Sequence, residues 1–213
     1  MNNALNSPCT FPIQTVFLDR DGVINEKLPE GSYVTRWEEF HVLPGVVEAI
    51  GLLNRAKIRV LVVSNQRGVA LGLYSAEDVR ALHAEFQKML EAHGAHVDSF
   101  YFCPHDKGQC NCRKPLGGMF DQAVQEFPAT TANTSAIIGD SIVDIEFGRR
   151  LGMTTVFLET APERQGPRAD VARHQADLRF TSLYAAVTEL TATQASHELA
   201  RGSICLGIPA DKS

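Results

Sequence analysis

Short apolar runs rich in β-branched residues, each ending in a polar residue, limit the fold of this chain more than any other feature. Three of them cover residues 14–19 (QTVFLD), 58–64 (IRVLVVS) and 135–140 (SAIIGD). Runs of this length without polar alternation are typical of strands that are buried on both faces of a sheet. Apolar runs at residues 98–102 and 154–158 predict two further strands.

Helical patterns lie between these runs. Apolar residues recur at helical spacing in residues 45–56, and a serine followed three residues later by an aspartate opens a helix predicted over 75–93. Shorter helices are predicted over 119–127 and 142–151. Strands that alternate with helices form βαβ units, so we expect an α/β fold: a three-layer, Rossmann-like parallel sheet with helices on both faces.

The periodic pattern weakens after residue 160. Residues 161–175 are rich in Pro, Arg and Gln, and they predict no clear element. We expect a short strand at 178–181, a helix at 183–190 and a flexible tail over 192–213. A chain of 213 residues can bury one substantial core, so we assign residues 1–191 to a single domain.

Charge and hydropathy exclude several classes of protein. The chain has 20 Lys and Arg against 25 Asp and Glu, a balance that does not suit a basic surface for nucleic acid. No run of about 18 apolar residues exists, and residues 1–10 lack the pattern of a secretion signal. We therefore expect a cytoplasmic protein without a membrane span, whose anionic ligands meet locally placed cations.

Polar side chains follow three of the predicted strands. Asp19 and Asp21 end the first strand, Ser64 ends the second and Asp140 ends the third. The carboxyl ends of parallel strands carry the active sites of such folds, so we expect these groups to meet. In a DxDG segment one carboxylate can attack while the other moves a proton, although the segment alone also fits a turn with solvated acids.

The same residues suit a metal ion. Mg²⁺ prefers oxygen ligands, and Asp19, Asp140 and a nearby backbone carbonyl can supply them. Asp144 lies four residues after Asp140 and shares its helix face. Asp144 therefore fits either the site or the role of an acid favoured at a helix N-terminus.

Two further pairs offer phosphate ligands. Ser64 and Asn65 provide a hydroxyl and an amide, while Arg113 and Lys114 provide two cations before a proline. Phosphate recognition needs donors and positive charge, which these pairs supply. Taken one at a time, Ser64 also fits a turn and Lys114 a solvated surface charge.

Three of the five cysteines lie within ten residues of one another. Cys103, His105, Cys110 and Cys112 form a C-x-H-x4-C-x-C pattern within residues 103–112. Three thiolates and one imidazole can complete a tetrahedral Zn²⁺ site with no open position, as in structural zinc sites. The spacing departs from a C-x2-C finger, so free thiols or redox chemistry remain alternatives.

Four motifs in order resemble the haloacid dehalogenase superfamily of phosphohydrolases. They are DRDG (19–22), a strand that ends in Ser64, Lys114 before a helix, and GDSIVD (139–144). The stretches FLDRDGVIN, LPG, SNQRGVALG and CPH…CNCRKP are similar to the branch that contains heptose bisphosphate and histidinol-phosphate phosphatases. The intervals between the motifs are filled by predicted elements and loops, so no separate cap domain is expected.

The resemblance implies a mechanism. Asp19 would attack phosphorus to give an aspartyl-phosphate, and Asp21 would protonate the leaving alkoxide and then deprotonate the hydrolytic water. Mg²⁺ would be bound by Asp19, Asp140 and the Asp21 carbonyl, while Ser64 and Lys114 neutralise phosphoryl oxygens. The resemblance also supports zinc in the 103–112 loop. A further implied role, for Asp144, is to orient Lys114 or metal-bound water.

The resemblance also points to a substrate. Asn65, Arg67 and Arg113 are candidate substrate contacts, and Arg67 stands where heptose enzymes commonly carry a serine. The implied reaction removes the 7-phosphate of D-glycero-D-manno-heptose 1,7-bisphosphate, by a monomer or weak oligomer acting on a small phosphorylated metabolite. Alternatives are histidinol phosphate or another small sugar phosphate, a DNA 3′-phosphatase, and a zinc-stabilised interaction module without activity.

Overall fold

The computed structural model describes residues 12–29, 31–159 and 168–204, and it contains one sheet of six strands. The strands are β1 (Thr15–Leu18), β2 (Arg59–Asn65), β3 (Ser99–Cys103), β4 (Ser135–Gly139), β5 (Thr154–Leu158) and β6 (Leu178–Phe180). Their order is β3-β2-β1-β4-β5-β6, and all neighbours pair in parallel. The predicted parallel α/β fold is confirmed.

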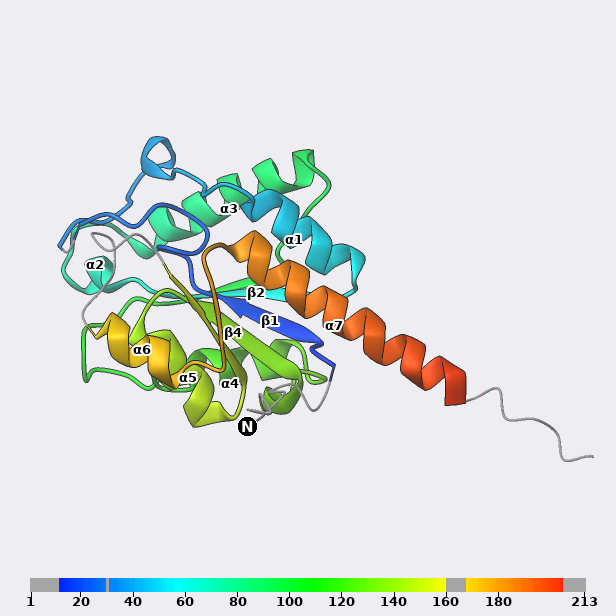
Figure 1. The fold of residues 1–213 in the computed structure, drawn as a ribbon. Coiled ribbons are helices and arrows are strands. Elements are labelled where there is room, and N and C mark those ends of the chain that lie inside the picture. The colour runs from blue at the N-terminus through cyan, green and yellow to red at the C-terminus, as the bar shows by residue number, and fades with distance from the viewer. Residues whose placement is uncertain (1–11, 30, 160–167, 205–213) are drawn as a thin grey trace, which may run out of the picture.

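Helices cover both faces of the sheet, which confirms the three layers (Figure 1). One face carries α1 (Val46–Arg55), α3 (Ala76–Ala92) and α7 (Leu183–Ile204). The other carries α4 (Gly118–Glu126), α5 (Ile142–Leu151) and α6 (Ala169–Gln175). Short elements at α2 (Arg67–Ala70), η1 (Trp37–Glu39) and η2 (Ala132–Thr134) complete the fold.

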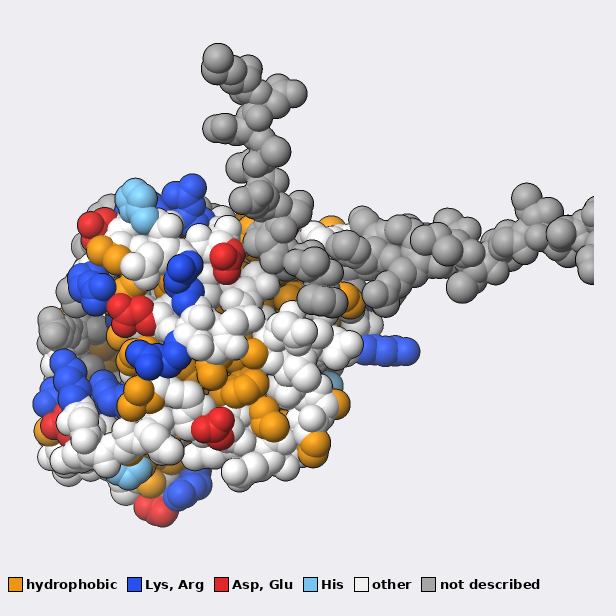
Figure 2. Space-filling model, turned by 90° about the horizontal axis from the view of Figure 1, so that it is seen from below, with side chains coloured by type: hydrophobic (Ala, Val, Ile, Leu, Met, Phe, Trp, Pro, Cys, Tyr) orange, Lys and Arg blue, Asp and Glu red, His pale blue; other side chains and the backbone are white. Residues whose placement is uncertain are grey.

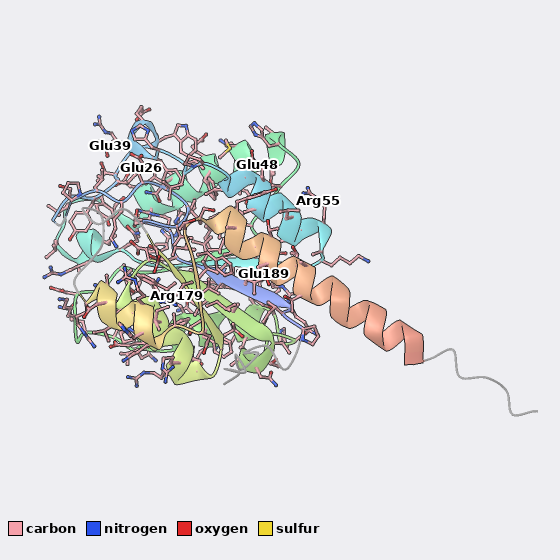
Figure 3. All side chains as sticks on the ribbon, in the orientation of Figure 1. Glu26, Glu39, Glu48, Arg55, Arg179 and Glu189 are labelled. Carbon is pink, nitrogen blue, oxygen red and sulfur yellow. The ribbon has the colours of Figure 1, made fainter. Side chains whose placement is uncertain are left out.

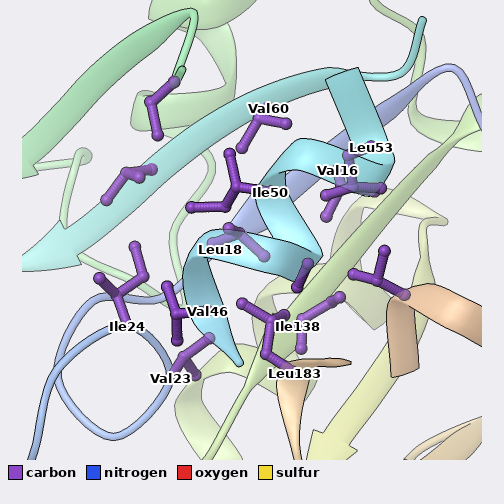
Figure 4. Close-up of a cluster of buried hydrophobic side chains, with 14 of the residues drawn as sticks. Val16, Leu18, Val23, Ile24, Val46, Ile50, Leu53, Val60, Ile138 and Leu183 are labelled. Atoms are coloured by element: carbon purple, nitrogen blue, oxygen red, sulfur yellow. The ribbon is translucent and has the colours of Figure 1, made fainter. Parts of the chain in front are cut away.

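The central strands alternate their side chains between two apolar cores. Val16 and Leu18 of β1 pack in the core under α1, α3 and α7, while Phe17 between them packs in the core under α4 and α5. Figure 4 shows Ile50 and Leu53 of α1 among the strand side chains of the first core. Because both faces of these strands are buried, their sequences are unbroken apolar runs.

Charged residues occupy the outer surfaces of the helices. Glu48 and Arg55 on α1 and Glu189 on α7 are exposed (Figure 3). In the view of Figure 2, basic and acidic side chains are interspersed on the described surface. Among the described residues, no helix combines the length and apolar character needed to cross a bilayer.

Helix α3 begins with the predicted capping box. The Ser75 hydroxyl accepts a hydrogen bond from the backbone N–H of Asp78 at 3.0 Å, and the Asp78 carboxylate accepts one from the backbone N–H of Ser75 at 2.8 Å. Two otherwise unpaired backbone donors are thereby satisfied, so the helix starts where the sequence predicts.

The carboxyl-terminal part differs from its prediction. Helix α6 occupies residues 169–175, where no element was expected. Helix α7 runs from Leu183 to Ile204, so its predicted end at residue 190 is wrong, and residues 192–204 are helical where a flexible tail was expected. Extending an existing helix is easier than nucleating a new one. Because the first half of α7 packs on the sheet, the helix can continue through a second half that lacks an apolar periodicity. Residues 205–213 lie outside the described residues.

The connections hold no additional sheet. Within the described residues, the chain between β1 and β2 forms η1 and α1, and the chain between β2 and β3 forms α2 and α3. All six strands belong to the central sheet, so these connections build no separate cap domain. The loops at the carboxyl ends of the strands surround the site.

Candidate active site

The carboxyl edge of the central strands carries a cavity of about 300 Å³. Pockets of this size suit small ligands. Among the residues predicted as functional, those that line it are Asp19, Asp21, Ser64, Asn65, Arg113, Lys114 and Asp144. Strands β1 and β2 end at this edge together with the loop before α4, so side chains far apart in sequence come together.

Lys114 is a buried cation between two carboxylates. Its Nζ lies 2.7 Å from Asp19 Oδ1 and 2.6 Å from Asp144 Oδ1, and it donates to the Val63 carbonyl at 2.7 Å. Burial by itself would lower the pKa of Lys114, but Asp144 and Asp19 together raise it. Lys114 therefore stays an ammonium and lies against the carboxylate predicted as the nucleophile.

Asp144 contacts both the start of α5 and Lys114. Its Oδ2 accepts from the backbone N–H of Ser141 at 3.2 Å and caps α5, while its Oδ1 holds Lys114. One side chain thus fixes the helix start and the ammonium, because its two oxygens point to different partners.

Asn65 lines the cavity, and its side-chain amide is hydrogen-bonded to the backbone of Lys114. Its Nδ2 donates to the carbonyl of Lys114 at 3.1 Å, and its Oδ1 accepts from the backbone N–H of Lys114 at 3.0 Å. This pair of hydrogen bonds fixes the Lys114 backbone against the end of β2. Asn65 positions the lysine in this structure, a role that the sequence did not predict.

Asp21 lies against a buried arginine that the sequence interpretation missed. Arg20 Nη2 donates to both carboxylate oxygens of Asp21, at 2.8 and 2.9 Å, and Asn25 Nδ2 donates to Oδ1 at 3.0 Å. Burial acts to raise the pKa of Asp21, but the Arg20 charge and the hydrogen bonds hold it below its usual value. Asp21 is therefore a carboxylate in this structure.

Gln66 joins Asp21 to Ser64. Its buried amide donates to Ser64 Oγ at 2.6 Å and to Asp21 Oδ2 at 3.2 Å. Its Oε1 accepts from Tyr74 at 2.7 Å, which fixes the orientation of the amide. Tyr74 in turn requires Gly68, since a Cβ there would lie 2.0 Å from the ring. A glutamine two residues after a strand-end serine was the available signal.

The acidic cluster suits a hard cation. Carboxylate oxygens of Asp19, Asp140 and Asp144 lie within 4.8 Å of one another. Burial and neighbouring carboxylates raise the pKa of Asp19 to about 7, and burial raises that of Asp140 to about 6. Asp140 Oδ1 is buried without a hydrogen-bond partner. A cation would satisfy that oxygen and favour the ionised form of both groups.

Gly22 leaves the space that the Asp140 carboxylate occupies. The backbone of Gly22 has φ of 96°, and a Cβ there would lie 2.3 Å from Asp140 Oδ2. Any side chain at this position would push the carboxylate out of the cluster.

The Cys and His side chains of the 103–112 loop converge. Cys110 Sγ lies 3.4 Å from Cys103 Sγ and 3.3 Å from Cys112 Sγ, and His105 Nδ1 lies 3.3 Å from Cys112 Sγ. These separations are far longer than an S–S bond of about 2 Å. Sulfur ligands of a tetrahedral zinc lie about 3.8 Å apart, and the four candidate ligand atoms all lie within 4.8 Å of one another. The four side chains therefore fit one ion.

Arg67 lies away from the cavity lining and against this loop. Its Nε donates to Asp106 Oδ1 at 2.5 Å and its Nη2 to Asp106 Oδ2 at 3.1 Å. The fork of the guanidinium matches a carboxylate in this geometry. The structure thus connects α2 to the cysteine loop, whereas Arg113 remains at the cavity.

Comparisons with known proteins find similar hydrolases. A family model described as HAD-hydrolase-like matches residues 111–186. The D-glycero-alpha-D-manno-heptose-1,7-bisphosphate 7-phosphatase of Mycobacterium bovis is 39% identical over 137 residues, which cover 64% of this chain and 72% of that protein. The beta-heptose 7-phosphatase of Bordetella bronchiseptica is 33% identical over 155 residues, covering 72% and 84% respectively.

Solved structures show the same fold. The D,D-heptose 1,7-bisphosphate phosphatase from B. bronchiseptica, complexed with magnesium and phosphate, aligns with a TM-score of 0.73 and 26% identity, over 85% of this chain and 99% of that one. The six-stranded parallel sheet and these similarities define a hydrolase of the haloacid dehalogenase (HAD) type. Within that class, the chain belongs to the family of phosphatases that includes these relatives.

Proposed function

We propose that this phosphatase removes the 7-phosphate of D-glycero-D-manno-heptose 1,7-bisphosphate. The observation that carries the proposal is the position of the Asp19 carboxylate, at the end of β1, in the cavity and 2.7 Å from a buried ammonium. According to their names, the two relatives described above act on this heptose bisphosphate, one on the alpha form and one on the beta form.

Magnesium is the proposed cofactor, and Asp19, Asp140 and the backbone carbonyl of Asp21 would hold it. The unpartnered Oδ1 of Asp140 and the close carboxylates support this assignment. When bound, the ion neutralises negative charge on the transferring phosphoryl group. Lys114 and the Ser64 hydroxyl provide the other positive and donor groups.

In the proposed reaction Asp19 attacks phosphorus, the bond from phosphorus to the sugar oxygen breaks, and an aspartyl-phosphate forms. The departing oxygen takes a proton from Asp21. Arg20 holds the pKa of Asp21 below its usual value, which favours the carboxylate. The negative charge of bound phosphate beside it would favour the protonated form that this step needs. Asp21 then removes a proton from water, which attacks phosphorus and releases phosphate and free Asp19.

We further propose zinc for Cys103, His105, Cys110 and Cys112. Burial raises the pKa of Cys103 and Cys112, so a cation is needed to stabilise their thiolates together. A loop held by a metal ion would position the adjacent Arg113 and Lys114 at the cavity and limit their conformational freedom.

The partner is proposed to be a small phosphorylated metabolite in the cytoplasm, without nucleic acid or membrane. Residues 1–191 would act as one phosphatase domain, as a monomer or weak oligomer. The mixed charges of the described surface support a small ligand over a nucleic acid strand (Figure 2).

The test is a comparison of phosphate release from heptose 1,7-bisphosphate in both anomeric forms, histidinol phosphate and fructose 1,6-bisphosphate, each with Mg²⁺ and with EDTA. We expect the highest kcat/KM for one heptose anomer. Equal or faster hydrolysis of histidinol phosphate would overturn the substrate assignment while retaining the phosphatase.

A further inference from the structure

Lys27 touches the predicted magnesium site although the sequence interpretation did not include it. Its Nζ lies 2.7 Å from Asp140 Oδ2, and the Asp140 side chain is 0% exposed while that of Lys27 is 30% exposed. Lys27 comes from the loop after β1, and its partly exposed side chain ends against the buried carboxylate.

Lys27 also lies between two cavities. It lines the catalytic cavity and a second cavity of about 210 Å³, which Gly22, Leu158 and Ser182 also line. No other described residue lines both of these cavities. The second cavity offers space into which the flexible side chain can move when it leaves Asp140.

Two ammonium groups face the three carboxylates of the predicted magnesium cluster. Lys114 contacts Asp19 and Asp144, and Lys27 contacts Asp140. Each carboxylate of the predicted magnesium cluster thus has an ammonium within hydrogen-bond distance. A divalent cation that binds Asp140 meets a carboxylate that already has a positive partner.

We propose that Lys27 is a resident cation that competes with Mg²⁺ at Asp140 and thereby sets the magnesium affinity. The inference rests on the proposed magnesium site. On metal binding, Lys27 either leaves Asp140 or stays as a like charge close to the ion, and both routes weaken binding. In the metal-free protein the same residue compensates a buried carboxylate.

Two effects of opposite sign follow from this role. Removing the Lys27 charge leaves Asp140 uncompensated, so the metal-free protein becomes less stable. The same change removes the competitor, so Mg²⁺ binds more tightly. A purely structural ion pair would give the first effect without the second, because loss of local order weakens a metal site.

The test uses the full chain and MgCl₂ as ligand. Wild type, Lys27→Met, Lys27→Arg and Lys88→Met are freed of magnesium by dialysis and titrated by calorimetry, with thermal midpoints taken with and without Mg²⁺. Lys88 is an exposed helix residue paired with Glu85, so it controls for loss of a surface ion pair. Asp140→Asn serves as the variant that lacks a magnesium ligand.

We expect Lys27→Met to bind Mg²⁺ about tenfold more tightly, which corresponds to about 1.4 kcal/mol. Its metal-free midpoint should fall by about 3 °C and its magnesium-induced shift should exceed that of wild type. Lys27→Arg and Lys88→Met should bind like wild type. Equal or weaker binding by Lys27→Met overturns the role of Lys27, whereas absence of binding by wild type overturns the magnesium site itself.

Discussion

The ammonium of Lys114 donates to the carboxylate of Asp19 at 2.7 Å, although the two residues are 95 positions apart in the chain. Strand β1 carries Asp19 to the sheet edge, and the loop after the cysteine cluster carries Lys114 to the same point. The predicted nucleophile is thereby held by a charge that also faces the cavity.

Asp19→Asn tests the nucleophile. An amide cannot attack phosphorus, so we expect Mg²⁺-dependent phosphate release to fall by at least about a thousandfold. The substitution keeps the shape of the side chain, and circular dichroism should show a folded protein. Retained turnover in a folded variant would show that another group attacks phosphorus.

Lys114→Met should destabilise the protein as well as inactivate it. The change leaves Asp19 and Asp144 buried without their cation, which costs about 3 kcal/mol of unfolding free energy. Urea titration measures the loss. Adding Asp144→Asn to Lys114→Met should restore part of the stability, because one unpaired charge is removed. An equally unstable double variant contradicts this account of the ion pair.

Tyr74→Phe tests the contacts that orient Gln66. Loss of the hydroxyl removes the hydrogen bond that fixes the Gln66 amide beside Asp21 and Ser64, at a cost of about 1 kcal/mol in stability. We expect kcat to drop about tenfold with little change in KM, since the ring still packs. Tyr33→Phe is the control. The centroid of the Tyr33 ring lies 5.6 Å from that of Tyr74, whereas the Gln66 amide is hydrogen-bonded to Asp21, Ser64 and Tyr74. An unchanged kcat in Tyr74→Phe argues against a positioning role.

Zinc content tests the cysteine loop. The purified protein should contain about one zinc ion per chain by metal analysis. Cys112→Ser should lower the metal content and the thermal midpoint together, because binding and local folding are coupled. A fully folded wild-type protein without zinc contradicts the ligand set.

The stability of the protein should fall in mild acid because of His83. Burial lowers the pKa of His83 to about 3, with the Arg20 charge acting in the same direction. Below the ordinary pKa of about 6.5, the unfolded chain binds a proton that the folded chain excludes, so stability falls by about 1.4 kcal/mol for each pH unit. This loss continues down to the folded pKa.

His83→Phe isolates that contribution. His83 stacks on Phe100 with ring centroids 4.6 Å apart, so a phenylalanine keeps the packing and removes the titration. Urea unfolding gives the free energy of unfolding of both proteins between pH 7 and about 5. As the pH falls, the stability of the variant relative to wild type should increase. A constant difference contradicts the buried neutral histidine.

The amino-acid sequence alone predicts the parallel α/β fold and the strand-end positions of Asp19, Ser64 and Asp140. Apolar runs buried on both faces and helices between them specify a sheet, and its carboxyl edge collects the residues that follow the strands. These inferences needed local pattern and chain order alone, as did the capping box at Ser75.

The partners of these groups depend on tertiary packing. The sequence does not reveal that Arg20 faces Asp21, that Arg67 binds Asp106 or that Lys27 reaches Asp140, because these contacts depend on how loops cross the sheet edge. The length of α7 was also missed, since its second half lacks an apolar period. Local chemistry places residues at an edge, and packing decides which charge lies beside which.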